Sequence, residues 1–203
     1  NEQANSVEVA VPTRNSDGAL KEVSGYLKKD AVSVGFLPYT QRIIIEQAFK
    51  MLNSPYGWGG MYGEQDCSRF IQEIFSTVGI MMPRNSAAQA KVGILAAQFS
   101  DETDPRVKTA ALKHKAVAGI TTLYMKGHIM LYLGSVDGRD FAIHAPWGYR
   151  EACPGGESGH KCHPEVFHVI NRVVVSDLSL GEGSWKKSLL ERLLTIRRID
   201  EGK

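Results

Sequence analysis

The segment DCSRFIQEIFSTV, residues 66–78, predicts an amphipathic helix that begins beside a cysteine. Its apolar side chains recur at three- and four-residue spacing, which places them on one helical face: Cys67, Phe70, Ile71, Ile74, Phe75 and Val78. Asp66 and Ser68 flank this cysteine, and one or the other lies in the first turn of the predicted helix. The dipole and free N–H groups of a helix N-terminus favour a thiolate, so this placement predicts a lowered pKa for Cys67. The alternative is that Cys67 is a small buried apolar residue, as many free cysteines are.

A second predicted helix precedes this segment. Thr40 can cap a helix whose apolar residues recur at helical spacing, namely Ile44, Ile45, Ala48, Met51 and Leu52. Residues 55–63 are rich in glycine and predict a loop between the two helices. Further along, Ser86 is a candidate cap for a third helix that reaches Ala97, and the polar residues 100–115 are predicted to be irregular.

The pattern then changes to strands. Residues 120–125, 128–133 and 141–145 are predicted strands, and residues 173–175 add another. Asp137-Gly138 predicts a hairpin between the second and the third of these strands. Helices followed by strands without regular alternation predict an α+β fold, with helices packed on one side of an antiparallel sheet.

Two of the six histidines, His128 and His144, lie in these predicted strands. If folding brings one of them to Cys67, that histidine can take the thiol proton while the other orients it, which is what nucleophilic catalysis needs. A regular Asp137-Gly138 hairpin, however, directs the two histidines to opposite faces of the sheet. A shared face therefore predicts a bulge, for which Gly134 is the natural site.

Composition excludes several other functions. The chain has 203 residues, with 24 Lys+Arg against 22 Asp+Glu and a net charge of +2, whereas nucleic-acid binders concentrate a basic excess. Apolar residues make up 43%, enough for the core of one ordinary domain with an appendage. No run of 18 apolar residues occurs, so no transmembrane segment is predicted. Residues 186–203 carry six basic and three acidic residues and are interpreted as a solvated face.

Five motifs in order resemble those of the NlpC-type cell-wall cysteine peptidases: YGWGG at 56–60, DCS at 66–68, PRNS at 83–86, GHI at 127–129 and IHA at 143–145. The resemblance covers about residues 38–180 and implies a circularly permuted papain-like fold. It implies that residues 38–203 form the peptidase domain. Residues 1–37 resemble the end of a bacterial SH3-like domain, whose remaining portion is expected to pack against them in a longer parent.

The resemblance also implies a role for each matching residue. Cys67 is the expected nucleophile, His128 the general base and His144 the residue that orients it. Tyr56 is expected to donate its hydroxyl to the tetrahedral oxyanion.

Four further residues are expected to contact the substrate. The resemblance implies that Trp58, Asp66 and Ser68 do so, and the Asp66 carboxylate suits the free amine of an N-terminal L-Ala. Arg69 replaces the glycine of many relatives. It either binds a substrate carboxylate bidentately or points to solvent.

The implied substrate is a peptidoglycan stem peptide, cut between γ-D-glutamate and an L-diamino acid through a Cys67 thioester. This chemistry needs no metal or cofactor, and its location is the cell envelope (periplasm) or outside the cell. The alternatives are an N-acetylmuramoyl amidase or acyltransferase with the same Cys and His, or a wall-binding module without activity.

An insert at residues 153–163 falls outside the family pattern and contains Cys153, His160, Cys162 and His163. In an oxidising compartment the preferred interpretation is a Cys153–Cys162 disulfide. Zinc binding and two free thiols are the alternatives.

Overall fold

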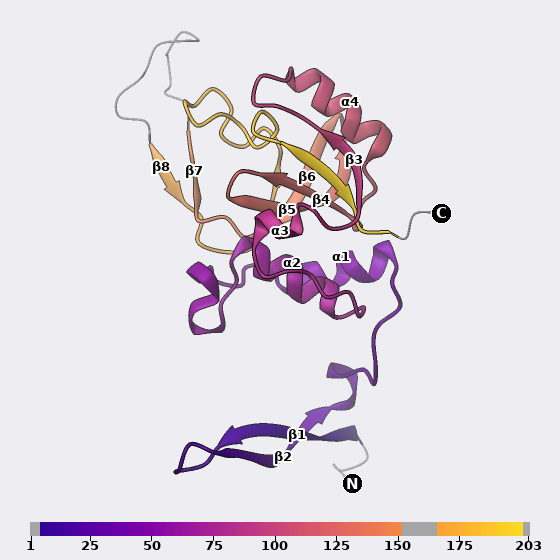
Figure 1. Ribbon diagram of the computed structural model, residues 1–203, viewed down its shortest axis with the longest axis vertical. Helices are drawn as coiled ribbons and strands as arrows, with labels where there is room; N and C mark the ends of the chain where they lie inside the picture. Colours follow the sequence, from indigo (N-terminus) through magenta and orange to yellow (C-terminus); the bar gives the residue numbers. More distant parts are fainter. Residues whose placement is uncertain (1–4, 152–165, 201–203) are drawn as a thin grey trace. The chain divides into compact units, whose positions relative to one another are not determined.

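The computed structural model describes residues 5–151 and 166–200, and Figure 1 shows its elements. The insert with Cys153 and Cys162, and therefore its predicted disulfide, lies outside the described residues. Backbone contacts divide the chain into two compact units, Asn1–Leu37 and Pro38–Lys203. None of the described helices is long and apolar enough to cross a lipid bilayer.

The first unit is a β-hairpin. Strand β1 (Ser6–Arg14) pairs antiparallel with β2 (Leu20–Lys28), and a short 3-10 helix, η2 (Lys29–Ala31), follows. The Asn15 side chain accepts hydrogen bonds from the backbone N–H groups of Asp17 and Ala19, which stabilises the turn. The assignment of this unit to an SH3-like domain stays a prediction.

The second unit contains a six-stranded antiparallel sheet in the order β3-β10-β4-β5-β6-β9. The strands are β3 (Ile94–Gln98), β4 (Thr121–Met125), β5 (His128–Val136), β6 (Arg139–His144), β9 (Val174–Asp177) and β10 (Thr195–Arg198). A separate two-stranded sheet joins β7 (Gly148–Arg150) to β8 (Phe167–Val169). The predicted strands after residue 119 are thus confirmed.

One face of the large sheet is covered by α1 (Gln41–Lys50) and α2 (Cys67–Ser76). The Thr40 side chain caps α1, and the Asp66 side chain caps α2, so both predicted helices are confirmed. The α2 residues with predicted apolar spacing pack against β5 and β6 in one core cluster, which includes Phe70, Ile71, Ile74, Phe75, Ile129, Leu131 and Ile143. The mixed α+β architecture is therefore as expected.

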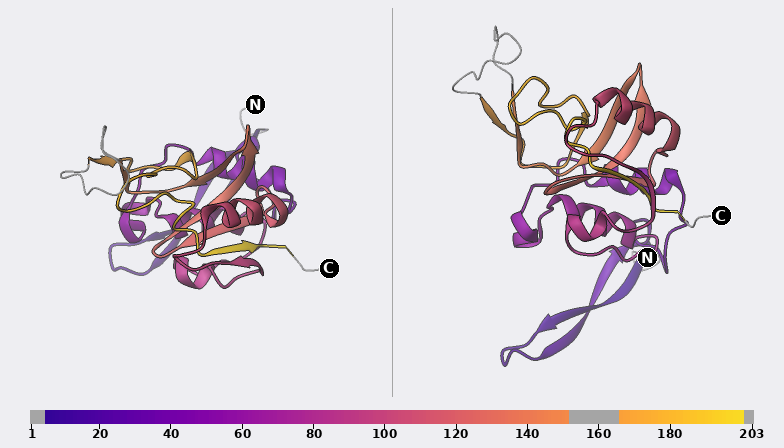
Figure 2. Two further views of the ribbon diagram at one scale, coloured as in Figure 1. Left: turned by 90° about the horizontal axis from the view of Figure 1, so that it is seen from above. Right: turned by 45° about the horizontal axis from the view of Figure 1, so that its top comes forward.

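The opposite face is also covered, by α4 (Pro105–Lys115) and the segment 178–193, contrary to the expectation of helices on one side. The strands lie between α4 and the α1/α2 pair in Figure 1 and in the right-hand view of Figure 2. The prediction that residues 100–115 are irregular was wrong, because Asp104 caps a helix whose first residue is Pro105. The interpretation of residues 186–203 as a solvated face was also wrong, since this tail contributes buried Leu189, Leu193, Ile196 and Ile199.

The third predicted helix is much shorter than expected. Helix α3 (Ser86–Gln89) is capped by Asn85 rather than Ser86, and residues beyond it form β3. Gly93 has a φ of 73°, and a Cβ there would lie 2.1 Å from the backbone oxygen of Arg198. Only glycine permits this close turn, after which pairing with β10 overrides the helical preference of the alanines.

The hairpin between β5 and β6 carries the predicted bulge. Gly134 pairs with Phe141 but Tyr132 pairs with Ala142, so Leu133 is the extra residue. Gly134 has a φ of 113°, which disfavours any other residue there. The register shift moves the two histidines onto the same face of the sheet, as predicted.

Candidate active site

Cys67 is the first residue of α2, and its side chain is 8% exposed. Burial raises the pKa of the Cys67 thiol, and the charge of Asp66 adds to this, although backbone N–H groups of Ile129 and Ser68 act in the opposite direction. The prediction of a lowered pKa was therefore wrong for this structure. Removal of the sulfur from water outweighs the helix N-terminus, so the thiol is neutral at rest.

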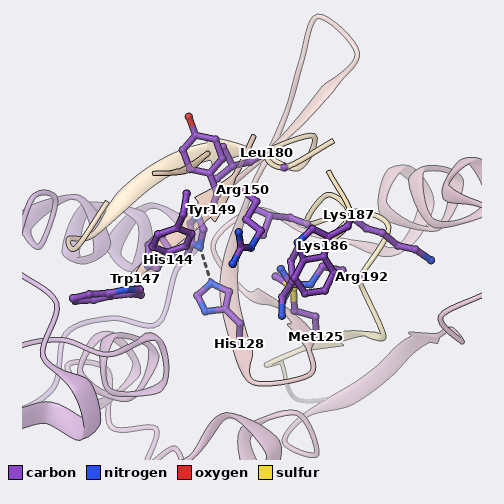
Figure 3. A pocket seen from close by; sticks show the side chains of 16 residues that line it. Met125, His128, His144, Trp147, Tyr149, Arg150, Leu180, Lys186, Lys187 and Arg192 are labelled. Carbon is purple, nitrogen blue, oxygen red and sulfur yellow. Dashed lines mark hydrogen bonds between the residues drawn. The ribbon is translucent and has the colours of Figure 1, made fainter. Parts of the chain in front are cut away.

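His128 and His144 form a hydrogen-bonded pair beside the sheet (Figure 3). His128 Nε2 lies 2.7 Å from His144 Nδ1, and His144 Nε2 lies 2.9 Å from Ser176 Oγ on β9. If each ring carries its proton on Nε2, His128 donates to His144 and His144 donates to Ser176. This tautomer leaves the lone pair of His128 Nδ1 available to accept a proton.

Both imidazoles are neutral near pH 7. Burial, with a smaller effect of the Arg192 charge, lowers the pKa of His128 to about 4. Burial also lowers the pKa of the fully buried His144 well below its ordinary value, and the neighbouring His128 contributes. A neutral imidazole is the form that can act as a general base.

Cys67 lies next to the strand that carries His128. The evidence is that the backbone N–H of Ile129, the residue after His128, faces the Cys67 thiol. Within the described ranges, no hydrogen bond joins the Cys67 thiol to the His128 ring. Catalytic hydrogen bonds often shorten only when the substrate binds, so a longer separation between these two groups is compatible with His128 as the general base.

Tyr56 lies close enough to Cys67 and Asp66 for its pKa to be affected by the charges that these two groups carry when they are ionised. Burial raises the pKa of Tyr56 to about 12, with further contributions from these two residues. The phenol is therefore neutral and can donate a hydrogen bond. Its ring packs edge-on against Trp147, with centroids 5.9 Å apart.

Asp66 and Ser68 form a polar cluster with Arg84. Arg84 Nη2 lies 2.7 Å from Asp66 Oδ2, and Arg84 Nη1 lies 3.0 Å from Ser68 Oγ, which in turn donates to Asp66 Oδ1 at 3.0 Å. Burial raises the pKa of Asp66, but the hydrogen bonds from Arg84, the Arg69 N–H and Ser68 outweigh it and hold this pKa below the ordinary value. The cluster thus contains an ionised carboxylate beside a guanidinium whose side chain is 43% exposed.

The other two residues expected to contact the substrate are Arg69 and Trp58. Arg69 is neither free in solvent nor aimed at an open site, because its Nε donates to Glu73 Oε1 at 2.6 Å and its Nη1 to the Gly60 oxygen at 3.3 Å. Trp58 begins the 3-10 segment η3 (Trp58–Gly63), is 75% exposed and contacts the Tyr56 ring.

Sequence reasoning missed three residues of this region. Arg84 belonged to a quoted motif but received no role. Gln89 is buried and donates to the backbone oxygens of Ser68 and Pro83, which ties α3 to the start of α2. Ser176 gave no local signal, since only the pairing of Ala142 with Ser176 brings its hydroxyl to His144.

Comparisons with known proteins agree with this fold. Residues 53–153 match the model of the NlpC/P60 family. The γ-D-glutamyl-L-lysine dipeptidyl-peptidase of Bacillus subtilis is 40% identical over 67 residues, which are 32% of this chain and 23% of that protein.

Two solved structures have a similar fold. An NlpC/P60 endopeptidase from Photobacterium damselae subsp. piscicida gives a TM-score of 0.64 at 19% identity, over 95% of this chain and 46% of that one. An NlpC/P60 family protein from Bacillus cereus ATCC 10987 gives 0.52 at 18% identity, over 94% of this chain and 50% of that one. The chain thus spans half or less of the length of these relatives.

Proposed function

Because residues 53–153 place this chain in the NlpC/P60 family, we propose that it is a cysteine peptidase that cuts peptidoglycan stem peptides between γ-D-glutamate and an L-diamino acid. The observation that carries the proposal is the Ser176–His144–His128 chain, which, with a proton on each Nε2, leaves His128 Nδ1 available beside the strand that faces Cys67. The name of the Bacillus subtilis relative, a γ-D-glutamyl-L-lysine dipeptidyl-peptidase, supports the choice of bond.

Acylation starts from a neutral thiol and a neutral imidazole. His128 Nδ1 accepts the Cys67 proton as the sulfur attacks the γ-carbonyl carbon of D-glutamate. His144 accepts a hydrogen bond from His128 Nε2 and so orients the imidazolium that forms. This imidazolium then protonates the amine of the diamino acid, the C–N bond breaks, and a thioester remains on Cys67.

Deacylation reverses the proton transfers with water as the nucleophile. His128 takes a proton from water, the hydroxide attacks the thioester carbonyl, and the proton returns to the Cys67 sulfur as it leaves. In both steps the oxyanion is stabilised by the neutral Tyr56 hydroxyl and by N–H groups at the start of α2.

The Asp66–Ser68–Arg84 cluster fits the acyl half of the substrate. A substrate that begins with L-Ala-γ-D-Glu carries a free amine and the α-carboxylate of glutamate. Asp66 is suited to the amine and the half-exposed Arg84 to the carboxylate, with Ser68 between them. Such stem peptides occur in the cell envelope, so the protein is proposed to act there or outside the cell.

The test is cleavage of synthetic L-Ala-γ-D-Glu-meso-diaminopimelate, followed by mass spectrometry. The unmodified chain should release meso-diaminopimelate, and Cys67→Ala should release none. Arg42→Gln is a matched control, because this arginine lies on α1 and its side chain is 87% exposed. Release of peptide from intact muropeptides with exposed lactyl groups would instead identify an amidase, and no reaction in either assay would reject the hydrolase.

A further inference from the structure

A pocket of about 360 Å³ opens beside the histidine pair. Its lining combines His128 and His144 with aromatic side chains and with four cationic residues, Arg150, Lys186, Lys187 and Arg192. Figure 3 shows the Arg150 side chain directed into the space between His128 and the group formed by Lys186 and Arg192, whereas Lys187 extends away from it. No acidic residue lines this pocket within the part of the chain that the structure describes.

Among these cations, Arg192 gives the clearest indication that the pocket binds an anion. It is half-buried, and burial lowers the pKa of its guanidinium. Arg84, Arg139 and Arg198 each form an ion pair with an aspartate, but Arg192 forms none within residues 5–151 and 166–200. A partly desolvated guanidinium without a carboxylate partner is costly unless an anion binds it.

Two of the other cations, Arg150 and Lys186, contact aromatic rings. Arg150 stacks over the rings of Phe167 and Trp185, and Lys186 lies over Trp185. Asp101 lines an adjoining depression with Arg192 but lies beyond ion-pair distance from it. Among the described residues, no carboxylate thus forms an ion pair with any of the four cations of the pocket.

The chemistry of the site decides which half of the substrate reaches this pocket. The acyl half bonds to Cys67, and the leaving amine takes its proton from His128. The group attached to that amine must therefore lie on the His128 side. Because His128 itself lines the pocket, the leaving diamino acid is its natural occupant.

We propose that this pocket binds the distal carboxylate of the leaving diamino acid through Arg192, and so selects meso-diaminopimelate over L-lysine. The inference rests on the proposed function and names its substrate class. The two diamino acids share an α-carboxylate and a distal amine, but meso-diaminopimelate has an additional carboxylate at its distal centre. Arginine matches a carboxylate with two parallel N–H···O bonds, and both Arg150 and Lys186 add positive charge nearby.

The first experiment compares kcat/KM for three substrates of the form L-Ala-γ-D-Glu-X. In these, X is meso-diaminopimelate, L-lysine, or meso-diaminopimelate with its distal carboxylate amidated. The amidated form differs from the first only in that group. We expect the free carboxylate to favour cleavage by about tenfold or more over both others, as one good charge-assisted interaction would.

Arg192→Gln should bring the three values to within a few-fold of one another, Arg192→Lys should retain part of the preference, and Arg42→Gln should leave it intact. The ratio cancels any change in His128 basicity, since the same base serves all three substrates. Lys186→Gln is a second pocket variant should Arg192→Gln fail to fold, and it should reduce the ratio. Equal cleavage of all three substrates by the unmodified chain would overturn the inference and leave the proposed function standing.

A binding measurement separates this inference from the proposed function. Cys67→Ala protein is titrated with free meso-diaminopimelate or L-lysine, and tryptophan fluorescence is followed because Trp147 and Trp185 line the pocket. Preferential binding of meso-diaminopimelate that is lost in Cys67→Ala/Arg192→Gln supports the site even if no substrate is cleaved. Equal binding, or none of either compound, overturns it.

Discussion

His128 Nε2 lies 2.7 Å from His144 Nδ1, although a regular hairpin would direct these two rings to opposite faces of the sheet. The extra residue Leu133 provides the shift, and Ser176 continues the hydrogen-bonded chain from the neighbouring strand. The catalytic geometry proposed here therefore depends on a bulge and on a third strand as well as on the two histidines.

His144→Ala should lower kcat by about 10²- to 10⁴-fold, because His128 loses the partner that fixes its tautomer and orientation. His144→Gln should recover part of this loss, since its amide can accept from His128. Ser176→Ala should cost less, because Ser176 acts only on His144. Steady-state kinetics on folded variants checks the series, and a Ser176→Ala defect larger than that of His144→Ala would contradict the assigned order.

Gly134→Ala should lower the free energy of unfolding by about 1–3 kcal/mol, because its φ of 113° is strained for any residue with a Cβ. Space is not the cause, since the nearest atom to a Cβ there would be Ala118 Cβ at 3.8 Å. Urea unfolding measures the effect, with Ser135→Ala, an exposed position in the same strand, as control. A Gly134→Ala protein as stable as this control would show that the bulge needs no positive φ.

The sequence predicted those helices and turns that are specified by residues close together in the chain. The Thr40 cap, the spacing of apolar residues after Cys67 and the Asp137-Gly138 turn each specify a few consecutive residues, and each prediction was confirmed. The bulge also followed from the sequence, once both histidines were required to share a face.

The elements and site residues that the sequence did not predict depend on contacts between residues that are far apart in the chain. Residues 94–98 have a helical composition but pair with β10, about a hundred positions later. Helix α4 has a local signal in Asp104-Pro105, but few of its residues are apolar, and within it only Leu112 and Lys108 are buried. Arg192 looked like part of a solvated tail because nothing nearby in sequence indicates that it lines a pocket with His128.

Acidification should destabilise the fold between about pH 6.5 and pH 4. The folded pKa of His128 is about 4 and that of His144 is also lowered, so the unfolded chain binds more protons than the folded one in this interval. Stability therefore falls as pH falls below the unfolded pKa, by about 2–3 kcal/mol for His128 alone. Urea unfolding at pH 7 and pH 5 measures this, and His128→Asn should show a smaller difference between the two pH values. An unfolding free energy that is equal at both pH values in the unmodified protein would contradict neutral, buried imidazoles.

Alkylation of Cys67 by iodoacetamide should accelerate through and beyond the ordinary thiol pKa of about 8.5, because burial raises the pKa of this thiol. The rate of label incorporation from pH 6 to 10, with Cys67→Ala subtracted to remove the signal of other thiols, gives the apparent pKa. A plateau already reached below pH 7 would show that the free protein holds a thiolate, and the mechanism would then begin from an ion pair.

Strand β10 has a consequence for how the protein is made on the ribosome. Residues 195–198 insert between β3 and β4, both synthesised much earlier, and β10 is the one partner of β3 among the strands that the structure describes. Until translation has passed residue 198, β4 presents an unpaired edge and β3 cannot join the sheet at all. A nascent chain that lacks β10 therefore has an open strand edge that can pair with other chains, so aggregation is a hazard until residues 195–198 are in place.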